Sequence, residues 1–77
     1  ESKIGNFVTF APGVKCNGNV VIEDNVFIGT GVIINNGTPK KKLTIGKNSF
    51  ISAGTIVNKD VPENSKVIGS QRLKNVT

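Results

Sequence analysis

The sequence predicts an all-β fold, in which very short strands joined by sharp turns wind into a coil. The prediction rests on a six-residue repeat and on the residue types at two positions of that repeat. Every repeat opens on an apolar residue, and eight of the nine fourth positions are Gly, Asn or Asp, which accept left-handed backbone angles at low cost. A period of six would scatter the apolar residues over different faces of a 3.6-residue helix, which makes helix the poorer prediction. The opening positions are Ile4, Phe10, Cys16, Ile22, Ile28, Ile34, Ile45, Ile51 and Val57.

The length of 77 residues allows at most one domain, near the size at which a single hydrophobic core gives marginal stability. A repeat coil buries only a thin axial column of side chains, so we expect further stabilisation from neighbouring copies. We predict one domain over 1–77, with coils over 1–62, an inserted loop at about 35–44 and a C-terminal cap over 63–77. We also expect the chain to be a fragment of a longer protein.

The composition excludes several function classes. The chain has no His, which excludes zinc enzymes that need His ligands, and we expect no metal. Its one cysteine, Cys16, cannot form an intrachain disulfide and is interpreted as inward-facing core filler. No apolar run approaches membrane length and no signal peptide is visible, so we expect a cytoplasmic protein without membrane insertion.

The net charge of +5 is concentrated in the three lysines at 40–42 and in a second cluster with Lys66, Arg72 and Lys74. No nucleic-acid-binding motif accompanies this charge, so we expect no nucleic-acid partner. A cofactor with several phosphate groups is the better fit. A basic surface that serves only solubility is the alternative.

The first coil, residues 1–21, carries a more specific pattern in residues 4–14, which read Ile-Gly-Asn-Phe-Val-Thr-Phe-Ala-Pro-Gly-Val. This stretch resembles the hexapeptide-repeat acyltransferases, in particular the sugar acyltransferases related to sialic acid O-acetyltransferase and the bacillosamine-pathway N-acetyltransferase. In these relatives a His followed by an acid is the general base, and a second His lies beside acetyl-CoA. By this resemblance Glu1 is the acid, the base is expected directly before it, and Thr9 stands at the second His position. Thr9 can form a hydrogen bond but cannot act as a base near neutral pH.

The resemblance implies a left-handed parallel β-helix of about three coils with three repeats in each coil. It also implies a homotrimer that transfers an acetyl group from acetyl-CoA to an amine or hydroxyl of a sugar, with acetyl-CoA between neighbouring β-helices. Gly18 and Thr30 align with positions that meet the cofactor or substrate. Since the chain itself contains no His, we expect these 77 residues alone to have little or no activity.

The second coil places Phe27 one coil beyond Thr9, and Phe50 continues the same outward column. Exposed apolar residues in one column favour burial against another copy of the chain. The count then breaks between Ile34 and Ile45, where five residues are added and the turn-forming, lysine-rich sequence predicts an exposed loop. Such a loop either reaches over a neighbouring copy or is solvated and without function.

The third coil, residues 45–62, closely resembles the closing stretch of the same family. Ala53 and Gly54 are small enough to let a pantetheine arm approach the backbone, and by resemblance they bind the cofactor. We expect Arg72, Lys74 or the lysines at 40–42 to meet its phosphates. A non-catalytic trimerising β-helix, either a scaffold or a lapsed enzyme, is the alternative to the acetyltransferase.

Overall fold

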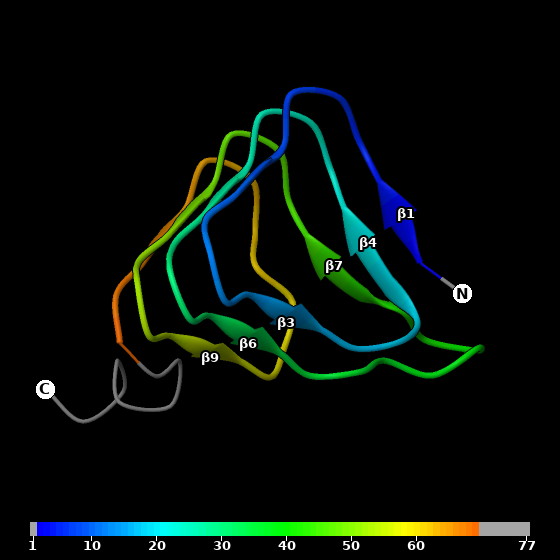
Figure 1. The fold of residues 1–77 in the computed structure, drawn as a ribbon. Helices are drawn as coiled ribbons and strands as arrows, with labels where there is room; N and C mark the ends of the chain where they lie inside the picture. Colours follow the sequence, from blue (N-terminus) through cyan, green and yellow to red (C-terminus); the bar gives the residue numbers. More distant parts are fainter. Residues whose placement is uncertain (1, 70–77) are drawn as a thin grey trace, which may run out of the picture.

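The computed structural model describes residues 2–69, which wind into a parallel β-helix with three faces (Figure 1). From β1 to β9, successive strands lie on successive faces, and every third strand returns to the face on which it started. Face 1 holds β1 (Lys3–Ile4), β4 (Val20–Ile22) and β7 (Leu43–Ile45). Face 2 holds β2 (Thr9–Phe10), β5 (Phe27–Ile28), β8 (Phe50–Ile51) and β10 (Lys66–Val67). Face 3 holds β3 (Lys15–Cys16), β6 (Ile33–Ile34) and β9 (Ile56–Val57).

The strand register confirms the six-residue repeat. Ile4 pairs with Ile22 and Phe10 with Ile28, so one turn of the helix takes eighteen residues, or three repeats. All of the strand pairs in residues 2–69 are parallel. The predicted all-β class is therefore confirmed.

The fourth positions of the repeat form the corners between faces. Asn19, Asn25 and Asn48 have φ near 60°, and Gly13, Gly31 and Gly54 have φ between 72° and 78°. Phe7 adopts the same left-handed conformation with φ 59°, although a bulky residue does so at a cost. The residue types at this position therefore identify the corners.

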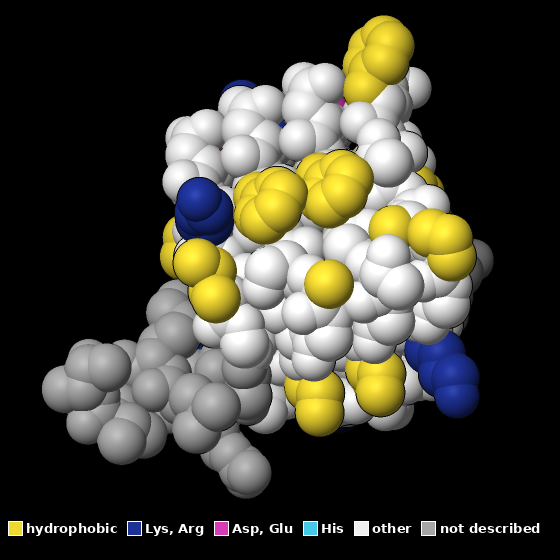
Figure 2. All heavy atoms as spheres, turned by 60° about the vertical axis from the view of Figure 1, so that its left-hand side comes forward, with side chains coloured by type: hydrophobic (Ala, Val, Ile, Leu, Met, Phe, Trp, Pro, Cys, Tyr) yellow, Lys and Arg dark blue, Asp and Glu magenta, His cyan; other side chains and the backbone are white. Residues whose placement is uncertain are grey.

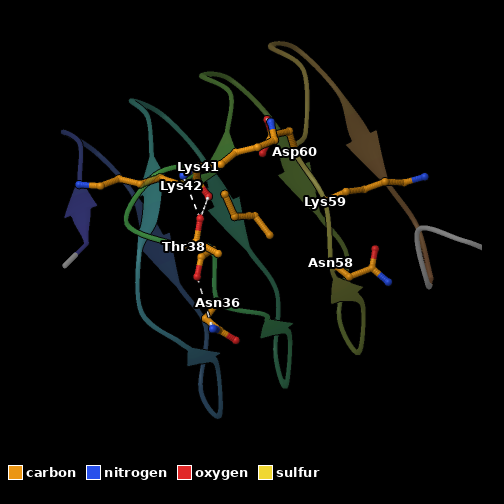
Figure 3. Close-up of a pocket in the computed structure, with 9 residues that line it drawn as sticks. Asn36, Thr38, Lys41, Lys42, Asn58, Lys59 and Asp60 are labelled. Atoms are coloured by element: carbon orange, nitrogen blue, oxygen red, sulfur yellow. Dashed lines mark hydrogen bonds and ion pairs between the residues drawn. The ribbon is translucent and has the colours of Figure 1, made fainter.

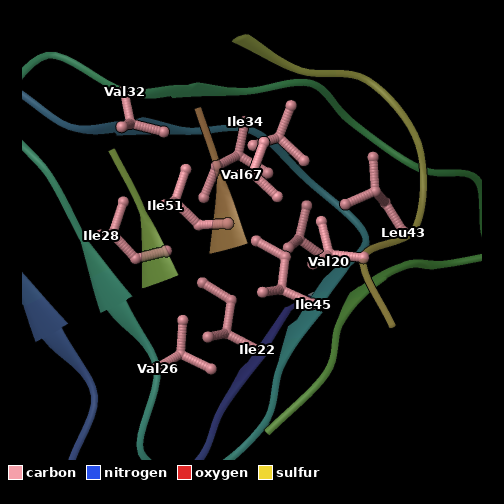
Figure 4. Packing of buried hydrophobic residues seen from close by; sticks show 12 residues of the cluster. Val20, Ile22, Val26, Ile28, Val32, Ile34, Leu43, Ile45, Ile51 and Val67 are labelled. Carbon is pink, nitrogen blue, oxygen red and sulfur yellow. The ribbon is translucent and has the colours of Figure 1, made fainter. Parts of the chain in front are cut away.

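The core is a single axial column of aliphatic side chains, viewed closely in Figure 4. It is built from first and fifth positions of the repeat: Val20, Ile22, Val26, Ile28, Val32, Ile34, Leu43, Ile45, Ile51, Val57, Val61 and Val67. Ser49 and Thr55 occupy fifth positions in the same column and are buried as well. The Ser49 hydroxyl donates to the carbonyl of Pro62 at 3.1 Å, so its burial leaves no unmatched polar group.

First-coil residues are less buried than the repeat predicts. Ile4 and Phe10 stand at first positions but remain 47% and 43% exposed, and Cys16 is exposed too. Within residues 2–69 these side chains have a coil on one side only. The interpretation of Cys16 as buried core filler is therefore wrong for the described part of the chain, although its position in the repeat is correct.

An added loop lies between β6 and β7, with tighter bounds than the predicted 35–44. The amide of Gly37 donates to the carbonyl of Gly18 at 3.0 Å. The amide of Gly31 donates to the carbonyl of Pro12 with the same sequence separation at the preceding corner, so the regular spacing of the coils extends as far as Gly37. Leu43 then pairs with Val20 in β4. The five extra residues are therefore 38–42.

The helix continues where the sequence predicts a cap. Val61 pairs with Ile45, and β10 pairs with β8, so residues 61–69 form part of a fourth coil. Two residues are missing between Val57 and Val61, which moves Val61 from the predicted fifth position to a first position. Residues 70–77, the rest of the predicted cap, lie outside the described residues.

Candidate functional site

Three of the predicted cofactor residues meet at the corner between face 2 and face 3. The amide of Gly54 donates to the carbonyl of Thr30 at 2.8 Å, so the two residues stack in consecutive coils. Thr30, Ala53 and Gly54 are all exposed. A Cβ on Gly54 would have no atom within 4 Å, so the space outside this corner is open.

The two coils are closely packed beneath that corner. A Cβ on Gly29 would lie 2.6 Å from the amide nitrogen of Ala53, so the backbones of the two coils touch there. The hydroxyls of Ser52 and Thr55 form a hydrogen bond of 3.0 Å within the turn. Thr55 is fully buried, so this hydrogen bond ties the turn to the core.

Thr9 lies on face 2, at the head of a column of outward-facing residues. It pairs in register with Phe27, which pairs with Phe50, and Phe50 pairs with Lys66. The ammonium of Lys66 lies 5.8 Å from the centre of the Phe50 ring. Figure 2, which turns this side of the helix forward, shows apolar side chains gathered on it. The predicted column of Thr9, Phe27 and Phe50 is thus confirmed as a geometric feature.

Gly18 lies at a different corner, between face 3 and face 1. A Cβ there would have no atom within 4 Å, so its surroundings are open. Face 3 separates Gly18 from the corner of Thr30 and Gly54. One copy of the chain therefore does not bring all the predicted cofactor residues together.

A groove beside Gly18 was not predicted from the sequence. It has a volume of about 560 Å³ and lies under the added loop, against the corner that follows β9. Its lining includes Asn36, Thr38, Lys41, Lys42, Lys59 and Asp60 (Figure 3). The groove could have been anticipated from the sequence, because the added loop and the two-residue deletion fall at the same corner in consecutive coils.

Three predicted site residues cannot be placed, because Glu1, Arg72 and Lys74 lie outside the described residues. Within residues 2–69 there is no group of three or more His, Cys, Asp or Glu arranged to hold a metal ion. No helix in that part of the chain could cross a membrane. Partial burial raises the pKa of the Cys16 thiol.

Comparison with known proteins supports a relation to sugar acetyltransferases. No model of a known protein family matches the chain. GDP-perosamine N-acetyltransferase of Escherichia coli O157:H7 is 59% identical over 46 residues, which are 60% of this chain and 21% of that protein. The chain thus spans about a fifth of the length of this relative.

Among solved structures, WeeI from Acinetobacter baumannii AYE is similar with a TM-score of 0.80 and 47% sequence identity. The match covers 88% of this chain and 35% of that chain. Together the two comparisons confirm the resemblance to sugar acyltransferases with hexapeptide repeats, and with it the left-handed parallel β-helix.

Proposed function

We propose that this hexapeptide-repeat β-helix, similar in sequence to a sugar N-acetyltransferase, is the acetyl-transferring part of an acetyl-CoA-dependent enzyme that acts on an amino sugar. The observation that carries the proposal is the 59% identity to GDP-perosamine N-acetyltransferase. The name of that enzyme states that it acetylates the nitrogen of an amino sugar. The open corner of Thr30, Ala53 and Gly54 supports it, because it offers a slender thioester arm a surface of small residues.

Acetyl transfer of this kind forms an amide bond. The amine nitrogen attacks the thioester carbonyl, the carbonyl oxygen becomes negatively charged, and the carbon–sulfur bond then breaks to release the thiol of coenzyme A. Backbone amides can stabilise the charged oxygen, and the protein lowers the barrier by holding the two reactants together. The amine must lose a proton during the reaction, and a positioned base typically contributes about 10²–10⁴-fold to the rate.

The base in this proposal is a His directly before Glu1, with the Glu1 carboxylate orienting the imidazole. Support comes from the sequence resemblance alone, in which Glu1 holds the acidic position. Thr9 would contribute a hydrogen bond to the cofactor and no proton transfer, since its hydroxyl does not ionise near neutral pH.

A homotrimer in solution is the second part of the proposal. Gly18 and the Thr30 corner lie on opposite sides of face 3, so a ligand that touches both would need a neighbouring copy to supply one of them. The apolar column of Phe27 and Phe50 is the surface that such a neighbour would cover. Acetyl-CoA then lies in the cleft between two helices.

The experiment that tests the function uses the full-length protein. Acetyl transfer from acetyl-CoA to an amino sugar nucleotide is measured with the native residue before Glu1 and with Ala in its place. The proposal expects the native residue to be His and the Ala variant to lose at least about a hundredfold in rate. Equal activity of the native protein and the Ala variant would contradict the proposed role of this residue as the general base.

The alternative is a trimerising β-helix without catalysis, and it is favoured by one observation, the absence of His from all 77 residues. Binding of acetyl-CoA to the full-length protein separates the two functions. A scaffold would trimerise without binding it.

A further inference from the structure

We propose that copies of this chain form a closed ring in which face 2 of each copy packs against face 3 of the next copy. The inference rests on the homotrimer of the proposed function and goes beyond it, because it identifies the two surfaces that meet. A ring of three copies needs two different surfaces that fit each other, since each copy presents one surface to the next copy and another to the previous one.

Face 3 carries an outward apolar column like the one on face 2. Ile33 pairs in register with Ile56. Both side chains point outward, because the residues that follow them, Ile34 and Val57, are fully buried in the core. Ile56 is 41% exposed, the same fraction as Phe50. Facing sheets pack about 10 Å apart, and large apolar side chains from both sheets fill that distance.

The two columns lie at the same heights along the β-helix. Phe27 and Ile33 are one repeat apart in the second coil, and Phe50 and Ile56 are one repeat apart in the third coil. Rotation about an axis parallel to the β-helix moves no residue along that axis. In a closed ring Phe27 of one copy therefore meets Ile33 of the next copy, and Phe50 meets Ile56.

Face 1 is the side that this ring leaves outside. Its outward column consists of Lys3, Val21 and Thr44, which pair in register from coil to coil. Within residues 2–69 this column contains neither Phe nor Ile, and two of its three members are polar. Faces 2 and 3 are thus the two faces that gain most from mutual burial.

The outer corners of the proposed interface carry opposite charge. When face 2 meets face 3, the corner between faces 1 and 2 of one copy lies opposite the corner between faces 3 and 1 of the next. The first corner carries three acidic residues and one lysine: Glu23, Asp24, Glu63 and Lys47. Lysines outnumber acids at the second corner, which carries Lys40, Lys41, Lys42, Lys59 and Asp60. Opposite charges at the rim favour this pairing of corners over the pairing of like corners.

The ring also brings predicted cofactor residues from two copies into one cleft. Thr9 stands at the head of the face 2 column, and Gly18 lies at the corner that borders face 3. In the ring, Thr9 of one copy and Gly18 of the next line the same cleft at the level of the first coil. Thr9 is smaller than the phenylalanines of its column, so the cleft is wider there. The cofactor site is therefore incomplete in a single copy.

The test is cross-linking of the full-length protein with a short bis-maleimide, in a background where every native cysteine, Cys16 included, is replaced by Ser. Copies with Phe50→Cys and copies with Ile56→Cys are examined separately and after co-expression. We expect cross-linked dimers in the co-expressed mixture and none with either variant alone. Thr44→Cys, on face 1 in the same coil, is the control and is expected to cross-link with neither variant.

Each other pattern identifies a different interface. Cross-links with Phe50→Cys alone mean that the Phe column meets its own counterpart, and cross-links between Phe50→Cys and Thr44→Cys mean that face 1 is the partner surface. Either result overturns the inference. Thermal unfolding checks that the variants fold, and Phe27→Cys with Ile33→Cys is the second pair. Absence of cross-links with both pairs also overturns it.

The charges at the rim are tested by sedimentation. Lys40→Glu with Lys42→Glu is expected to weaken association of the copies by at least about tenfold at low salt, with a smaller effect at high salt. Lys3→Glu, on face 1, is the control and is expected to leave association unchanged. Association of the double variant that equals or exceeds that of the native protein contradicts the placement of these two corners at one rim.

The outcome is separable from that of the proposed function. An active acetyltransferase whose Phe50→Cys copies cross-link with one another contradicts the pairing of faces 2 and 3 and leaves acetyl transfer intact. A protein that cross-links only in the mixture and transfers no acetyl group contradicts the function and retains the interface.

Discussion

The phenyl rings of Phe27 and Phe50 are stacked nearly parallel, with centroids 5.1 Å apart and an angle of 7° between the planes. Their backbones pair in register in neighbouring coils, so the stack follows from the spacing of the coils. About two fifths of each residue remains exposed, at 38% and 41%. An aromatic pair held rigid in this way loses little side-chain entropy when another surface covers it.

Replacing both phenylalanines with Ser is expected to weaken self-association. Each ring that a neighbouring copy covers should contribute about 1–2 kcal/mol to the interface. Sedimentation equilibrium should show a trimer for the native chain at micromolar concentration and smaller species for the double variant. Phe7, which is 85% exposed and off this column, gives the control when replaced with Ser. A native chain that sediments as a monomer would refute both the trimer and the role of the column.

Replacing Phe7 with Asn is expected to stabilise the fold by about 1 kcal/mol. Phe7 holds a left-handed backbone with φ 59°, which Asn adopts at lower cost. Since the Phe7 side chain is 85% exposed, its removal gives up little packing. Urea unfolding measures the change, and Phe7→Ala serves as the comparison that removes the ring without favouring the left-handed angle. A decrease in the free energy of unfolding for Phe7→Asn would show that the ring is needed.

Replacing Gly29 with Ala is expected to destabilise the fold by about 1–3 kcal/mol. Its new methyl group would meet the backbone of Ala53 at 2.6 Å, and backbone cannot turn aside as a flexible side chain can. Thermal unfolding measures the loss. Gly18→Ala is the matched control, because open space surrounds that position and the change should stay within about 0.5 kcal/mol. Equal stabilities of the two variants would mean that the coils can separate at this corner.

The reactivity of Cys16 is expected to depend on pH with a midpoint above that of an ordinary thiol. Partial burial raises the pKa of Cys16, so the reactive thiolate forms only at higher pH in the folded chain. Because the pKa of the thiol is higher in the folded chain, the folded chain favours the protonated thiol. The contribution of Cys16 to the free energy of unfolding is therefore fully present below the pKa of the unfolded chain and is lost as pH rises through the pKa of the folded chain. Alkylation rates from pH 7 to 10, in buffer and in denaturant, give the two midpoints. A folded midpoint at or below the unfolded one would contradict the burial effect.

Much of the fold could be predicted from the sequence because the repeat encodes two properties at once. Apolar first positions such as Ile22 and Ile28 became the core, and Asn or Gly at every fourth position except Gly37 took the left-handed angles. Residues 61–67 read Val-Pro-Glu-Asn-Ser-Lys-Val and align with Ile-Gly-Lys-Asn-Ser-Phe-Ile at 45–51, with Asn-Ser identical and Val in place of Ile at both ends. The fourth coil was missed because counting in sixes fails once two residues are deleted.

The site was less predictable because its shape depends on contacts that no repeat specifies. The small residues at Ala53 and Gly54 follow from the family resemblance, and the structure places them beside Thr30. The groove depends on the turn that Thr38 closes with Lys41 and on the distance between successive coils at one corner. Neither can be read from the lysine-rich composition of the loop.

Both departures from the eighteen-residue coil, five residues added and two removed, fall at the corner between face 3 and face 1. On either side of this corner the side chains of Ile34, Ile45, Val57 and Val61 stay in the same axial column. The other two corners keep their length throughout residues 2–69. The corner between face 3 and face 1 therefore tolerates insertions and deletions, and a foreign peptide or binding loop could be inserted there without displacing a core residue.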